Sequence, residues 1–177
     1  LDEVQTGFGR TGKMFGFEWS EIVPDIIVFA KGLGGGMPIG AFVSSREKMQ
    51  KLTNNPVLGH ITTFGGHPVC CAAGMAALEV LLEEKLVDTV FEKEQLFRSL
   101  LQHPKVEAIR SRGLMMTLVF DSFETNKKII DACIANGVIT DWFLFAANCL
   151  RIAPPLTITE EEIKKACAVI VDCLDAF

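Results

Sequence analysis

Residues 24–41 read PDIIVFAKGLGGGMPIGA and carry the clearest fold signal in the chain. A turn-forming Pro24-Asp25 pair introduces the apolar run 26–30, and Lys31 with a glycine-rich turn follows directly. A short unbroken run of β-branched and aromatic residues between turn formers is typical of a strand buried on both faces, as in parallel sheets. This stretch therefore indicates a chain of mixed α/β structure.

On either side of this strand, the pattern divides the chain near residue 85. The glycine-rich loops lie in residues 1–85, and residues 86–177 alternate helices and strands as a compact α+β unit. Expected elements of the first part are a loop at 1–16, a strand at 40–45, a short helix at 46–52, a loop at 53–67 and a helix from Pro68 to about Lys85. Expected elements of the second part are a helix at 86–102, strands at 106–110 and 114–120, a helix at 126–136, strands at 138–140 and 149–153, and a final helix capped by Thr159 and Glu162.

The composition argues against several classes of partner. The chain has 177 residues, 49% of them hydrophobic, and a formal net charge of -5, with its basic residues scattered. That balance lacks the basic surface needed to bind a nucleic-acid backbone. No apolar stretch reaches the ~20 residues needed to span a bilayer, and no basic-then-apolar signal peptide opens the chain. We therefore expect a cytoplasmic protein that binds neither nucleic acid nor membrane.

Six cysteines are spread over the chain, namely Cys70, Cys71, Cys133, Cys149, Cys167 and Cys173. They fall at apolar positions, no CxxC pair occurs, and only three histidines could join them in a zinc site. We expect buried, reduced thiols that act as small hydrophobic side chains, and no metal.

Lys31 is the first candidate for chemistry. Its ammonium would lie where an apolar strand meets a flexible glycine turn, and desolvation there favours the neutral amine that Schiff-base chemistry requires. The glycines that follow would let a bulky group approach the backbone closely. The same pattern also fits a lysine that simply reaches solvent at a strand end. A nucleotide phosphate loop is a weaker alternative, because Gly34-Gly35-Gly36 is not followed by the Gly-Lys-Ser/Thr of a P-loop.

Three further positions offer complementary groups, each with an ordinary structural alternative. Asp2, which leads into a glycine loop, could hydrogen-bond a buried cationic nitrogen or be a plain loop acid. Thr63 stands beside the Gly65-Gly66 pair, an arrangement that binds anions or simply forms a turn. Arg151 lies on an apolar strand before Pro154-Pro155. Its guanidinium suits bidentate recognition of a carboxylate, although a strand arginine with a buried stem is common.

Four segments, taken in order, resemble the motifs of one known family. They are residues 2–12 (DEVQTGFGRTG), residues 24–41, residues 63–68 (TFGGHP) and residues 150–156 (LRIAPPL). They resemble, in turn, the signature loop, the lysine motif, the phosphate-contact loop and the C-terminal arginine motif of the class III (subgroup II) pyridoxal-phosphate-dependent aminotransferases. This family includes the ornithine, acetylornithine and 4-aminobutyrate aminotransferases. The resemblance covers the whole chain.

The resemblance implies a role for each site residue. Asp2 would pair with the protonated pyridine nitrogen of pyridoxal 5'-phosphate (PLP), and Gln5 would contact the 3-oxygen of the ring. Lys31 would hold the cofactor as a Schiff base and then transfer protons as general base and acid. Thr63 would bind the cofactor phosphate of a neighbouring subunit, which implies a homodimer with shared active sites. Arg151 would bind the α-carboxylate of the substrate or of 2-oxoglutarate.

The resemblance also implies a fold and an activity. The expected fold is fold type I of the PLP-dependent transferases, with residues 1–85 as the end of the large PLP-binding domain and residues 86–177 as the small C-terminal α+β domain. The expected activity is transfer of an amino group from an ω-amine or amino acid to a 2-oxo acid. Because nothing here matches the N-terminal cofactor contacts of the family, we expect a C-terminal fragment that is inactive alone. The alternatives are another class III enzyme, such as an aminomutase, and a non-catalytic binding or assembly module of the same fold.

Overall fold

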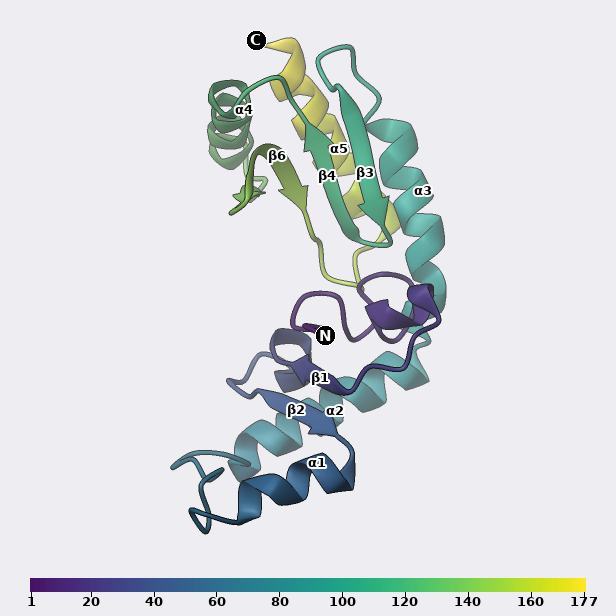
Figure 1. Cartoon of the computed structure of the whole chain (residues 1–177). Coiled ribbons are helices and arrows are strands. Elements are labelled where there is room, and N and C mark those ends of the chain that lie inside the picture. Colours follow the sequence, from purple (N-terminus) through teal and green to yellow (C-terminus); the bar gives the residue numbers. More distant parts are fainter. The chain divides into compact units, whose positions relative to one another are not determined.

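A computed structural model describes all 177 residues, which fold into two compact units, Leu1–Val87 and Asp88–Phe177 (Figure 1). The division lies close to the one expected near residue 85. Each unit has its own sheet and its own helices. No helix in either unit combines the length and the apolar character needed to cross a bilayer. The assignment of the units to a large and a small PLP domain stays a prediction.

The first unit contains a two-stranded antiparallel sheet. Its strands are β1 (Ile26–Phe29) and β2 (Ala41–Ser44). The expectation that β1 is buried on both faces is wrong for this chain, because Ile26 and Val28 are 43% and 40% exposed and only Phe29 is buried. The apolar run does form a strand, but a sheet of two strands has too few neighbours to cover both of its faces.

The remaining elements of the first unit are helical. They are η1 (Gly16–Ser20), η2 (Lys31–Gly34), α1 (Arg46–Gln50), η3 (Lys51–Thr53) and α2 (Pro68–Glu83). α2 begins at a proline, as the sequence predicted, because the fixed φ angle and missing N–H of proline suit a first helical turn. α2 packs closely against η2, the turn that carries Lys31.

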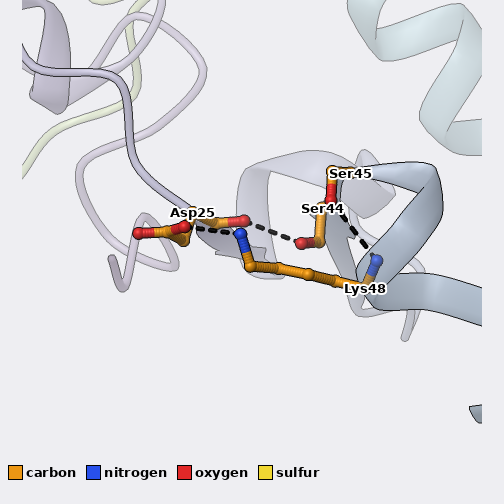
Figure 2. Close-up of polar contacts among 4 residues, drawn as sticks. All are labelled: Asp25, Ser44, Ser45 and Lys48. Atoms are coloured by element: carbon orange, nitrogen blue, oxygen red, sulfur yellow. Dashed lines mark hydrogen bonds and ion pairs between the residues drawn. The ribbon is translucent and has the colours of Figure 1, made fainter. Parts of the chain in front are cut away.

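A polar cluster ties the start of β1 to α1 (Figure 2). The Asp25 carboxylate accepts a hydrogen bond from Lys48 Nζ at 2.6 Å, and the Asp25 carbonyl accepts one from Ser44 Oγ at 2.7 Å. Ser45 caps α1, since its hydroxyl accepts a hydrogen bond from the Lys48 amide at 3.3 Å. The hydrogen bond and the charge of the Lys48 ammonium hold the pKa of Asp25 below its usual range. The pair is exposed, so it fixes local geometry more than it adds stability.

The second unit is built on a four-stranded antiparallel sheet of order β3-β4-β6-β5. Its elements are η4 (Leu86–Thr89), α3 (Val90–Leu100), β3 (Ala108–Arg112), β4 (Met115–Val119), α4 (Phe123–Ala135), β5 (Asp141–Phe143), β6 (Ala146–Ile152) and α5 (Glu160–Asp175). η4 leads into α3 across the boundary between the two units. Figure 1 shows α5 passing behind β3 and β4. One hydrophobic cluster joins sheet and helices, and its fully buried members include Phe97, Leu118, Leu150, Ile163 and Leu174. This unit therefore has a closed core of its own.

Three strands in the second unit differ from the expectation, and the first of them, β3, lies two residues beyond the expected 106–110. The strand expected at 138–140 lies instead at β5 (Asp141–Phe143), and Ile139 is 92% exposed. β6 starts three residues before the expected residue 149, because it forms a hairpin with β5 around a two-residue turn at 144–145. The helix expected at 86–102 is divided into η4 and α3. The capping box that opens α5, by contrast, is confirmed.

Five of the six cysteines are buried, as expected, but Cys71 on α2 is exposed. Burial raises the pKa of the Cys133 thiol to about 12, and the neighbouring Cys173 contributes to that rise. Burial alone raises the pKa of Cys167 to about 12. These two thiols therefore behave as small apolar side chains rather than nucleophiles.

Candidate active site

Lys31 lies where β1 ends, as the first residue of η2. Its backbone φ of 45° falls in the left-handed region, which residues with a side chain seldom adopt. Such a conformation costs about 1–2 kcal/mol and persists where the surrounding structure holds it, often at a functional site. The side chain is exposed within this chain. The sequence suggested that the Lys31 amine is desolvated, but the residues of this chain do not by themselves remove it from solvent.

Close packing against α2 holds the η2 turn in place. Gly35 has a φ of 55°, and a Cβ atom there would lie 2.7 Å from both the Ala73 carbonyl oxygen and the Ala77 Cβ. Gly74 makes the reciprocal approach, since a Cβ atom there would lie 2.5 Å from the Leu33 carbonyl oxygen. Atoms in a packed interior do not come this close without displacement. The small residues of α2 thus permit the close contact with η2.

Asp2 pairs with β1 three residues before Lys31. Residues 1–3 run parallel to β1, with the Glu3 amide donating to the Val28 carbonyl at 2.9 Å and Asp2 bridging to Val28. This pairing brings Asp2 close in space to the strand that leads to Lys31, although the two residues are far apart in the sequence.

An aromatic contact that the sequence did not reveal anchors the loop that carries Asp2 and Gln5. The Phe8 ring lies with its centroid 5.6 Å from that of Phe29, at the end of β1. Gly32 in the lysine turn approaches the same side chain, since a Cβ atom on Gly32 would lie 3.3 Å from Phe8 Cβ. The loop, the strand and the lysine turn therefore share one packing contact.

Glu3 is a buried carboxylate that sequence reasoning also missed. It accepts hydrogen bonds from the Gly16 amide at 2.9 Å, the Phe17 amide at 2.7 Å and the Thr6 hydroxyl. The neighbouring Asp2 carboxylate is exposed and accepts a hydrogen bond from the amide two residues further on, at 2.8 Å. Glu3 therefore folds the loop on itself while Asp2 faces outward.

Thr63 lines a cavity of about 340 Å³ in the first unit. The other walls come from residues 62–67, from residues 38–40 and from Cys70. Residues 38–40 connect the lysine turn to β2, so Thr63 lies beside the far end of the turn that Lys31 opens. Two neighbouring threonine hydroxyls give this cavity hydrogen-bond donors suited to an anion.

Arg151 lies on β6 of the second unit and is paired with Asp141 of β5. Its Nε donates to Asp141 Oδ1 at 2.7 Å, and its Nη2 donates to Asp141 Oδ2. The guanidinium carbon lies 5.8 Å from the ring centroid of Phe143. Asp141 was not predicted from the sequence, because the strand that carries it was expected three residues earlier. Of the five predicted site residues, only Arg151 lies in the second unit.

Solved aminotransferases share this fold. The ornithine aminotransferase from Toxoplasma gondii superposes with a TM-score of 0.88 at 33% sequence identity, over 99% of this chain and 42% of that chain. The acetylornithine aminotransferase from Elizabethkingia anophelis superposes with a TM-score of 0.85 at 31% identity, over 99% of this chain and 45% of that chain. The chain therefore has the fold of the fold type I PLP-dependent transferases, as the sequence predicted.

Sequence comparison narrows this class to one family. Residues 1–174 match the family described as aminotransferase class-III. Acetylornithine aminotransferases from Caldanaerobacter subterraneus subsp. tengcongensis and Haemophilus ducreyi are 41% and 40% identical to the chain, each over 98% of its length. The chain belongs to the class III aminotransferase family, and the predicted resemblance to that family is confirmed. It spans only 44% and 43% of the length of these two relatives.

Proposed function

We propose that this chain supplies the cofactor-binding lysine and a substrate-binding arginine of a PLP-dependent aminotransferase. The enzyme would move an amino group from an ω-amine or amino acid donor to a 2-oxo acid. The observation that carries the proposal is the backbone of Lys31, which is left-handed and held there by glycine contacts with α2. These contacts fix the backbone from which the Lys31 side chain leaves the end of β1.

The residues around Lys31 fit PLP. Lys31 supplies an amine at the end of β1, and Asp2, which pairs with β1 at Val28, supplies a carboxylate. A Cβ atom on Gly36 would meet nothing within 4 Å, so the turn leaves open space. Thr63 lines a separate cavity, which would take the cofactor phosphate of a neighbouring subunit. When bound, PLP supplies an electron sink for the negative charge that develops on the substrate carbon.

Each residue then has a distinct task. Asp2 would accept a hydrogen bond from the pyridinium N–H and, by its charge, would keep the proton on that nitrogen. Lys31 would hold the cofactor through Nζ and would act as general base and acid through the same nitrogen. Gln5 would contact the 3-oxygen of the ring, Thr63 would donate to the cofactor phosphate of a neighbouring subunit, and Arg151 would bind an α-carboxylate.

The proposal extends to the whole protein. Because the chain spans less than half the length of its relatives, we propose that it is the C-terminal part of a longer protein. The first unit would end the large PLP-binding domain, and the second would be the small domain. The enzyme would act in the cytoplasm as a homodimer with shared active sites, with 2-oxoglutarate as amino acceptor. Residues 1–177 alone would bind PLP poorly and turn over no substrate.

Borohydride reduction tests the assignment of Lys31. The full-length product of the gene that encodes this chain is incubated with PLP and reduced, and the phosphopyridoxyl label is located by peptide mass spectrometry. We expect the label at Lys31 and its loss in Lys31→Ala. Lys48→Ala is the matched control, because Lys48 is an exposed lysine of the same unit that is ion-paired with Asp25. Labelling of equal yield at another lysine, or in Lys31→Ala, would contradict the proposal.

A further inference from the structure

Arg151 and Asp141 end a row of side chains that crosses the sheet of the second unit. Arg110, Thr117, Arg151 and Asp141 are successive register partners on β3, β4, β6 and β5. Register partners point to the same face of a sheet, so the row places two cations on that face with a single anion. That anion, Asp141, is bonded to one of the two cations, Arg151.

Asp141 holds the Arg151 guanidinium in a defined position. Two parallel N–H···O bonds join them, from Nε at 2.7 Å and from Nη2, and the Phe143 ring lies beside the guanidinium. Thr140 Oγ1 donates to the Arg151 carbonyl at 2.6 Å and fixes the backbone below. The two charged side chains remain 31% and 48% exposed, so a dissolved carboxylate has access to the pair.

We propose that Asp141 is a specificity-determining residue, which competes with the substrate carboxylate for Arg151 and so weakens the binding of carboxylate-bearing substrates. This inference rests on the proposed role of Arg151 in carboxylate binding. Asp141 cancels the charge of the guanidinium and covers the Nε–Nη2 edge, one of the edges through which a carboxylate makes a two-bond contact. An incoming carboxylate either displaces Asp141 or binds beside it, where the like charges repel.

The Asp141–Arg151 pair therefore reduces the difference in binding free energy between amino donors that carry a carboxylate and donors that do not. A donor without a carboxylate leaves the ion pair intact, and neither Asp141 nor Arg151 loses its partner. A donor with an α-carboxylate, or a 2-oxo acid, gains only part of the attraction that an arginine without Asp141 would provide. Specificity is the difference between two binding free energies, and Asp141 reduces that difference by acting on one of them.

Binding of glutarate to the full 177-residue chain measures this competition without cofactor or turnover. Glutarate is titrated at low salt into isotope-labelled chain, and the NMR signals of β5 and β6, including the Trp142 indole, report its binding. Asp141→Asn removes the charge and keeps the shape of the side chain. Asp131→Asn is the matched control, since it removes one negative charge from an exposed ion pair of the same unit, with Lys127 on α4.

We expect Asp141→Asn to lower the Kd for glutarate about tenfold, or about 1.4 kcal/mol. Asp131→Asn should bind glutarate as the parent chain does, and adding Arg151→Gln to Asp141→Asn should remove the gain. The gain should also shrink as salt is added, because the pair is open to solvent. A Kd in Asp141→Asn equal to or above that of the parent chain, or no binding to either, overturns the inference. The proposed function fails by a different result, namely a borohydride label at a lysine other than Lys31. That result would not change the measured binding of glutarate.

Discussion

The contact between η2 and α2 predicts a large loss of stability when Gly35 is replaced by alanine. The φ of 55° places alanine in the left-handed region, which costs about 1–2 kcal/mol. The new methyl group would also lie 2.7 Å from the Ala73 carbonyl oxygen and the Ala77 Cβ, so the backbone of η2 must move away from α2. Overpacking of this kind costs about 1–3 kcal/mol. We therefore expect Gly35→Ala to lower the free energy of unfolding of the first unit by about 2–5 kcal/mol.

Gly36→Ala separates the two contributions. Gly36 has a φ of 96°, and its added Cβ meets nothing within 4 Å, so this variant carries backbone strain without a contact. Because the φ of Gly36 is more positive than that of Gly35, the backbone strain in Gly36→Ala is at least as large as in Gly35→Ala. The difference in stability between the two variants therefore underestimates the cost of the new contact at Gly35. Gly35→Ala should still be the less stable of the two, by about 1 kcal/mol or more.

The two tryptophans allow each unit to be followed by itself. Trp19 lies in the first unit and Trp142 in the second, so a Trp142→Phe background restricts the fluorescence signal to the first unit. Urea titrations then give the free energy of unfolding by linear extrapolation. Equal stability of Gly35→Ala and Gly36→Ala would refute the close approach of η2 to α2. The structural support for the position of Lys31 would be lost with it.

Three further predictions concern buried and charged groups elsewhere. Glu3→Gln should destabilise the first unit by about 1–3 kcal/mol in the same urea assay, because a buried carboxylate that accepts two backbone amides loses its charge; unchanged stability would argue against this anchor. An alkylating reagent at neutral pH should modify the exposed Cys71 of the folded chain and spare Cys133, whose pKa is raised to about 12 by burial; peptide mass spectrometry showing early labelling of Cys133 would disprove it. Asp25→Asn should lower stability at neutral pH but not in acid. Lys48 lowers the pKa of Asp25 in the folded chain. The stabilisation by the ionised Asp25 is therefore present above the unfolded-state pKa of this carboxyl and disappears as the pH falls through its folded-state pKa. An equal effect of Asp25→Asn on urea unfolding at both pH values would count against this prediction.

The features that the sequence predicted correctly depend on neighbouring residues. The apolar run after Pro24-Asp25 forms a strand, and α2 begins at Pro68. The capping box at Thr159 opens α5, because a threonine and a glutamate three residues apart satisfy each other's backbone amides. Each of these signals is complete within a few positions of the chain, so no knowledge of the tertiary structure was required.

The features that the sequence did not reveal depend on contacts between distant segments. Asp141 was missed because its pairing with Arg151 follows from the register of β5 against β6, and a shift of three residues in β5 changes every partner. Phe8 reads as an ordinary loop residue, yet it packs on Phe29. Glu3 reads as a surface acid, although backbone amides more than ten residues away surround it.

Burial was predicted well in the second unit and poorly in the first, and one cause explains both outcomes. The second unit closes its own core, whereas the first exposes apolar side chains on both strands and on α2, with Phe42 at 47%, Met75 at 64% and Leu82 at 56%. Monomeric proteins rarely leave such surfaces open. Because the relatives are more than twice as long as this chain, we infer that the remainder of a longer protein, or a second subunit, covers them. The desolvation that the proposed amine chemistry requires of Lys31 would then be a property of the assembled enzyme, and this chain would contribute the turn that presents the amine.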